Sequence, residues 1–119
     1  MKDNTLLAEY RGYKLKVREP AGPNLFENKD GEWFWEHEWH PNSDWNQLMM
    51  VVEKADCDFK IELNIGDHNV KYRYLAKLIF YGRSQGDNAR MEMLYYGHGE
   101  TRKKSLYNAC VEYIKTQKP

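Results

Sequence analysis

The segment His40–Asp58 (HPNSDWNQLMMVVEKADCD) constrains the fold of this chain more than any other stretch. Ser43 or Asn42 can accept a hydrogen bond from one of the backbone N–H groups that the first turn of a helix leaves unpaired, and Asp44 suits the positive end of the helix dipole. Apolar residues follow at helical spacing. The segment therefore predicts a helix over residues 43–55.

This helix has one apolar stripe, in which Trp45 is expected to be the first buried anchor and to fix the helix to a sheet. A second helix is predicted over residues 101–116, again with a single apolar stripe. Asn4 or Thr5 is expected to cap a shorter helical turn that ends at Gly12. The stripes comprise Trp45, Leu48, Met49, Val52 and Ala55 in the first helix and Leu106, Cys110, Tyr113 and Ile114 in the second.

Alternation of apolar and polar residues predicts the strands. In the arm 70–81 the even-numbered face is apolar or aromatic, whereas the odd-numbered face begins with Lys71 and Arg73 and becomes apolar at Leu75. We expect another part of the structure to cover the apolar end of that second face. The predicted strands are Tyr13–Val17, Trp33–Glu38, Asp58–Ile65, residues 70–81 and Arg90–Tyr96; Glu19–Glu32 and Gly82–Ala89 are predicted loops, and Gly97-His98-Gly99 a break.

Length and composition indicate one domain, residues 1–119, of the α+β class. We expect an antiparallel sheet of about three to five strands with the two main helices packed on it. No apolar run has the length of a membrane span or of a signal peptide. Cys57 and Cys110 are therefore expected to be reduced thiols that pack in the fold, and the protein to be cytoplasmic.

The run DWNQLMMVVEK at Asp44–Lys54 resembles a DWNxLMxVVEK block of small uncharacterised proteins from bacteria and their phages. TLLAEYRG at Thr5–Gly12 and SLYNACVEYIK at Ser105–Lys115 are similar to the opening turn and the closing helix of the same family, in the same order. The named group that the chain resembles is the phage ABA sandwich domain, in which helices cover a sheet. The resemblance implies a phage or mobile-element origin and an α/β/α sandwich, and it implies no activity.

Four Trp residues lie within thirteen positions, from Trp33 to Trp45. Such a segment is typical of a core, but it can also form a groove for a ligand or a peptide. Acidic neighbours argue against nucleic acid at this place, because they repel phosphate. The candidate partner-binding surface here is Trp33, Trp35, His37, Trp39 and His40.

The net charge is zero, but residues 1–59 hold seven Lys or Arg against twelve Asp or Glu, and residues 60–119 hold eleven against six. The halves can neutralise each other across the fold, or the C-terminal half can present a basic surface. Proteins that bind single strands combine such a surface with aromatic rings. The candidate nucleic-acid surface is Lys71, Arg73, Lys77, Arg83 and Arg90, which Arg102, Lys103 and Lys104 can extend.

The sequence contains no recognisable catalytic or metal motif. The His and Cys residues lack the spacing of a zinc site, and no nucleophile elbow, phosphate loop or dinucleotide fingerprint is present. We therefore predict no enzyme activity, no metal and no cofactor.

The leading hypothesis is a small accessory protein that binds a protein partner or a second copy of itself. Besides the aromatic residues, side chains suited to interfaces are Met49, Met50, Met91 and Met93. The alternative is a single-stranded nucleic-acid-binding protein that uses the basic C-terminal half. No membrane partner is predicted.

Overall fold

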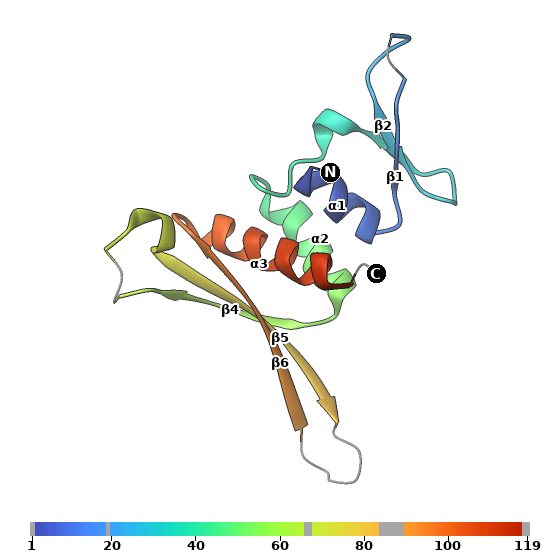
Figure 1. Ribbon diagram of the computed structural model, residues 1–119. Coiled ribbons are helices and arrows are strands. Elements are labelled where there is room, and N and C mark those ends of the chain that lie inside the picture. Colours follow the sequence, from blue (N-terminus) through green and yellow to red (C-terminus); the bar gives the residue numbers. More distant parts are fainter. Residues whose placement is uncertain (1, 19, 66–67, 84–89, 118–119) are drawn as a thin grey trace.

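The computed structural model describes residues 2–18, 20–65, 68–83 and 90–117. The described chain has three α-helices and two three-stranded antiparallel sheets, which confirms the predicted α+β class (Figure 1). The elements are α1 (Asp3–Tyr10), β1 (Lys14–Lys16), β2 (Leu25–Glu27), β3 (Trp33–Trp35), a 3-10 turn (Glu36–Glu38), α2 (Trp45–Ala55), β4 (Asp58–Leu63), a second 3-10 turn (Val70–Tyr72), β5 (Tyr74–Arg83), β6 (Arg90–Gly99) and α3 (Arg102–Gln117).

The strands divide into a small sheet, β1–β2–β3, and a large sheet, β4–β5–β6, where the sequence analysis expects one sheet. The predicted loop Glu19–Glu32 is wrong at Leu25–Glu27, which forms the central strand of the small sheet. Phe26 explains this strand, because its ring is buried and lies 5.4 Å from the ring of Phe34. The free energy gained by burying the ring of Phe26 outweighs the preference of the residues on either side for turns.

Two predicted strands are shorter than expected because 3-10 turns replace one end of each. The predicted strand at Trp33–Glu38 ends at Trp35, whose backbone N–H donates to the carboxylate of Glu38 (3.1 Å). The predicted arm 70–81 begins only at Tyr74. There the side chain of Asn69 accepts a hydrogen bond from the backbone N–H of Lys71 (3.0 Å) and stabilises the turn.

At α1 and α2 an acidic residue, and not the expected Ser, Asn or Thr, marks the start of the helix. Asp44 caps α2 by accepting a bond from the backbone N–H of Gln47 (3.2 Å), so Ser43 and Asn42 are not the caps. Asn4 and Thr5 lie inside α1, which begins at Asp3 without a side-chain cap. Its predicted end is confirmed, because Gly12 adopts a φ of +93° that favours glycine.

Trp45 is not a buried anchor of α2, because it is the first residue of the helix and 38% of it is exposed. The side chains of α2 that are buried lie further along, at Leu48, Val51 and Val52. These residues pack toward α3, since α2 contacts that helix and not mainly a sheet. The prediction that Trp45 fixes a helix to a sheet is therefore wrong.

Helix α3 lies against the large sheet, and α1 and α2 pack on α3 (Figure 1). The small sheet stands beside α1, away from the large sheet. All three described helices therefore lie on one side of the large sheet, whereas the sandwich implied by the family resemblance has helices on both sides.

Two glycines of β6 let α3 approach the sheet. A Cβ atom at Gly97 would lie 2.2 Å from the backbone N of Ala109 and 2.4 Å from the carbonyl O of Ser105. A Cβ atom at Gly99 would lie 2.5 Å from the backbone N of Ser105. Gly97-His98-Gly99 is thus part of the strand, and the predicted break is wrong: these glycines are needed for a close approach and not for a turn.

Aromatic rings fill the space between the sheet and the C-terminal half of α3. The ring of Tyr113 stacks on Phe80 with centroids 4.5 Å apart and meets the edge of Tyr95 at 5.1 Å. Its hydroxyl lies 3.4 Å from that of Tyr10, so the same cluster joins α1 to α3. The predicted apolar face of the long arm is confirmed here, because Ala76 and Leu78 are buried beneath α3.

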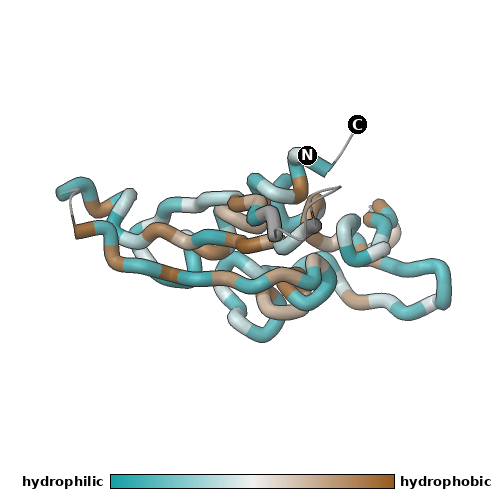
Figure 2. Tube along the Cα trace, turned by 90° about the horizontal axis from the view of Figure 1, so that it is seen from below, coloured by the Kyte–Doolittle hydropathy of each residue, from teal (hydrophilic) through white to brown (hydrophobic). Residues whose placement is uncertain are grey.

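The other side of the large sheet carries no helix of the described chain. Strand register groups its residues in rows: Glu62, Leu75 and His98; then Lys60, Lys77 and Tyr96; then Asp58, Ile79 and Leu94; then Tyr81 and Glu92. We call this surface the open face. The strands carry both hydrophilic and hydrophobic residues (Figure 2), and the rows of the open face mix charged side chains such as Lys77 with apolar ones such as Ile79.

We predict that Gly97→Ala destabilises the protein by about 3 kcal/mol or more, because the added methyl group meets backbone atoms of α3 that cannot rotate away. Urea unfolding followed by circular dichroism measures the loss. Gly82→Ala is the control: it lies in the same hairpin with no atom within 4 Å of its Cβ position. Equal stability of the two variants would contradict the described packing.

Candidate functional site

The Trp-rich segment splits between the surface and the core. Trp33 is 53% exposed, and its ring meets that of half-buried Trp35 edge to face at 4.9 Å. Trp39 is only 5% exposed, and its indole N–H donates to the carbonyl of Asn4 (2.7 Å). Trp39 is therefore a core residue and does not belong to an exposed surface.

The two histidines of the same segment are exposed but do not converge. The imidazole Nδ1 of His40 lies 3.1 Å from the hydroxyl of Ser43, which places it against the loop before α2. His37 lies in the 3-10 turn after β3. Of the candidate partner-binding residues, Trp33 and Trp35 are the two that the structure brings into direct contact.

The candidate nucleic-acid residues are spread over three places. Lys71 and Arg73 are exposed at one end of the large sheet, and Lys77 lies on the open face, 3.6 Å from the carboxylate of Glu62. Arg83 and Arg90 are register partners at the far end of the β5–β6 hairpin, and their side chains lie outside the described residues. The five residues do not form one surface.

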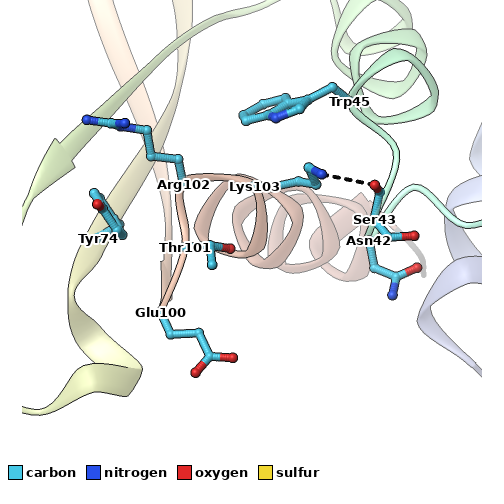
Figure 3. Close-up of a pocket in the computed structure, with 8 residues that line it drawn as sticks. All are labelled: Asn42, Ser43, Trp45, Tyr74, Glu100, Thr101, Arg102 and Lys103. Atoms are coloured by element: carbon cyan, nitrogen blue, oxygen red, sulfur yellow. Dashed lines mark hydrogen bonds between the residues drawn. The ribbon is translucent and has the colours of Figure 1, made fainter.

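A cavity of about 680 Å³ instead brings together residues from the starts of α2 and α3, and we call it the α2–α3 hollow (Figure 3). The guanidinium of Arg102 lies 5.3 Å from the ring centre of Tyr74. The ammonium of Lys103 donates to the carbonyl of Ser43 (2.9 Å) and lies 6.0 Å from the ring centre of Trp45. The lining residues are Asn42, Ser43, Trp45, Tyr74, Glu100, Thr101, Arg102 and Lys103.

A second cavity of about 360 Å³ shares Glu100 with the first, and we call it the β6–α3 hollow. The rings of Tyr72 and His98 meet edge to face there, with centroids 5.3 Å apart. The amide of Asn108 donates to the carbonyl of His98 (2.6 Å), which holds α3 beside the end of β6. The lining residues are Lys71, Tyr72, His98, Gly99, Glu100, Lys104 and Asn108.

The sequence analysis missed the role of Trp45 in this region. It placed Trp45 in the core. Trp45 directly follows the capping residue and so belongs to the first turn of the helix, which has a neighbouring turn on its C-terminal side only. Arg102 and Lys103 were identified as an extension of the basic surface. Their contacts with Trp45 and Tyr74 depend on tertiary structure and carry no local sequence signal.

Neither thiol has the properties of a nucleophile. Burial, followed by the nearby Asp58 and Asp56 carboxylates, raises the pKa of Cys57 to about 11. Burial, followed by Cys57, raises the pKa of Cys110 to about 12. Both groups are therefore protonated at neutral pH and pack as small apolar side chains.

Among the described residues, no group of three or more His, Cys, Asp or Glu side chains is arranged to hold a metal ion. None of the helices in the described ranges has both the length and the hydropathy needed to cross a bilayer. No family model, curated protein or solved structure matches this chain.

We predict that a disulfide reagent modifies Cys57 and Cys110 about a hundredfold more slowly at pH 8 in the folded protein than in the unfolded protein. At pH 8 the raised pKa values reduce the fraction of reactive thiolate by about this factor at Cys57 and by more at Cys110, since the pKa of an unburied thiol is about 9.0. Release of thionitrobenzoate, followed spectroscopically with and without urea, measures the two rates. Rapid reaction of both thiols in the folded protein would contradict their described environment.

The same shifts predict a pH dependence of stability. The folded-state pKa values exceed those of the unfolded chain, so the stabilisation is complete below pH 9 and is lost as the pH rises from 9 toward 11–12. The free energy of unfolding should therefore fall over this range. A variant with Cys57→Ser and Cys110→Ala is the control, and its stability should fall less between pH 9 and 10.

Proposed function

We propose that this protein acts by binding protein, and that the occupant of its open face is a second copy of the chain. Small size, cytoplasmic location and a phage or mobile-element origin belong to the same proposal, and the block at Asp44–Lys54 supports that origin. The observation that carries the proposal is an excess of exposed surface over that of a folded monomer.

The chain exposes 8200 Å², whereas a monomeric protein of 14.3 kDa exposes about 6,800 Å². The excess is greater than the surface of about 800 Å² that each partner buries in a standard interface. The radius of gyration agrees, because it is 16.5 Å where about 13.5 Å is expected for a compact domain of this length. Such a surplus supports a protein that completes its burial by association.

The open face has an apolar centre. Leu94 and Tyr96 are adjacent on β6 and are 38% and 46% exposed, with Ile79 beside Leu94 on β5. The sequence analysis expects the apolar end of this face to be covered, and no described helix covers it. Exposed neighbouring apolar side chains on one surface are typical of an interface.

The charges on the open face favour a second copy over an unrelated partner. Two copies can pack their open faces together about a two-fold axis that lies between the two sheets and runs perpendicular to the strands. The axis passes between the rows of Lys60 and Asp58, and the strands of the two copies are then antiparallel. Lys60 then meets Asp58 of the other copy, and Tyr96 meets Leu94. In the outer rows His98 meets Glu92. On β4 and β6 the face is therefore complementary to itself in charge and in apolarity, whereas on β5 the operation places Lys77 opposite Ile79.

We predict that the protein forms a dimer whose fraction rises with concentration across the micromolar range, and that Leu94→Lys abolishes it. The new charge would be buried in the centre of the interface without a partner. Sedimentation velocity or size-exclusion chromatography with light scattering measures the state. Val17→Lys is the matched control, because Val17 is 70% exposed and lies near the small sheet.

A charge exchange tests the register of the two copies. Asp58→Lys alone places Lys opposite Lys60 of the other copy and should weaken the dimer about tenfold, whereas Asp58→Lys with Lys60→Asp should restore most of the affinity. A monomer at every concentration, or a dimer that Leu94→Lys leaves intact, would overturn the proposed function.

A further inference from the structure

We propose that the α2–α3 hollow and the β6–α3 hollow together form a binding site for single-stranded nucleic acid. The inference rests on the rings and cations around the N-terminal end of α3 and not on the proposed self-association, with which it shares the residue His98. Each hollow would hold one base against an aromatic ring and its phosphate near a cation, so that neighbouring nucleotides of one strand occupy neighbouring hollows.

The two hollows present four aromatic rings at the surface. In the first, Trp45 is 38% exposed and Tyr74 forms another wall. In the second, Tyr72 is 43% exposed and packs against His98. Stacking on such rings is the main sequence-tolerant contribution to single-strand binding, because every base offers a planar face.

Cations lie beside these rings and lack carboxylate partners. Arg102 and Lys103 line the first hollow, and Lys71 and Lys104 line the second. In the described part of the chain, ion pairs form at Lys16, Lys60 and Lys77 but at none of these four residues. The surface is therefore positive locally in a protein whose net charge is zero, and phosphate is the complementary group.

Among the described residues, Glu100 is the one acidic residue that lines either hollow, and it lies where they meet. Its carboxylate points away from Trp45 and Arg102 (Figure 3). The four cations outnumber it across the site. The N-terminal end of α3 adds a further partial positive charge, with Thr101 accepting a hydrogen bond from the backbone N–H of Lys104 (3.1 Å).

The arrangement favours a single strand over a duplex or a free nucleotide. Rings set in hollows can stack only on bases whose faces are open, which paired bases in a duplex do not offer. Two adjoining hollows with the same pairing of ring and cation favour a chain of nucleotides over one nucleotide. A strand that engages both sites gains affinity from the connection between them.

The test is fluorescence anisotropy with labelled single strands of deoxythymidine and of uridine, about 12 nucleotides long, at low and moderate salt. We expect saturable binding at low salt. Arg102→Gln with Lys103→Gln should weaken it about tenfold and reduce the slope of log affinity against log salt by about 1.4. Trp45→Leu should weaken it about tenfold without changing the slope, which separates stacking from charge.

A matched control removes equal charge elsewhere. Lys14→Gln with Lys29→Gln alters a cavity of about 640 Å³ beside β1, which contains four cations and no aromatic ring. This control should change the affinity less than twofold. Leu94→Lys should also retain binding, so that failure of self-association and failure of this site are distinguishable.

Four results would each overturn the site. The first is no binding at low salt, and the second is an equal loss of affinity in the Arg102 and Lys103 double variant and in the control. The third is unchanged affinity of the Trp45→Leu variant, and the fourth is equal affinity for a duplex of the same length. Competition by thymidine monophosphate as effective as that of the oligonucleotide would overturn the assignment of the two hollows to one strand. Circular dichroism confirms that each variant is folded.

Discussion

The close approach of α3 to β6 is the contact on which the rest of the structure depends. Gly97 and Gly99 leave the backbone of α3 almost touching the strand, and Ser105 and Ala109 are fully buried at the contact. Helices α1 and α2 then pack on α3 and reach the large sheet mainly through it. The same contact holds the start of α3 at the end of β6, and both hollows form around that start.

Elements whose hydrophobic pattern repeats over many residues were predicted correctly from the sequence. The prediction failed at glycines, because a glycine can serve two different structural purposes. The alternation in the arm 70–81 identified the face that α3 covers, and the helices 43–55 and 101–116 were found to within two residues. Glycine permits a turn and also permits a close approach of two backbones. The sequence around Gly97 does not distinguish these uses, because the difference lies in α3, which packs from elsewhere in the chain.

The tryptophans show a second limit of local patterns. Trp39 and Trp45 both have polar neighbours in the sequence, yet Trp39 is buried while Trp45 lines a cavity. A helical stripe predicts which side of a helix is apolar, but it does not give the length over which a neighbour covers that side. In the small sheet, β1 and β3 lie within predicted strands, whereas β2 was missed. This strand has three residues between turn-forming residues, too few for alternation to be detectable.

The lengths of the elements explain why part of the large sheet stays uncovered. A helix of 16 residues such as α3 is about 24 Å long, whereas a strand of ten residues such as β5 is about 33 Å long. One helix therefore covers the half of the hairpin that ends at Gly99 and leaves the far end, at Gly82, uncovered. The two shorter helices stack on α3, and none remains for the other side of the sheet. The open face that this arrangement leaves carries both charged side chains and adjacent apolar side chains. A surface that only contacts solvent does not require adjacent apolar side chains, so this composition favours contact with a partner.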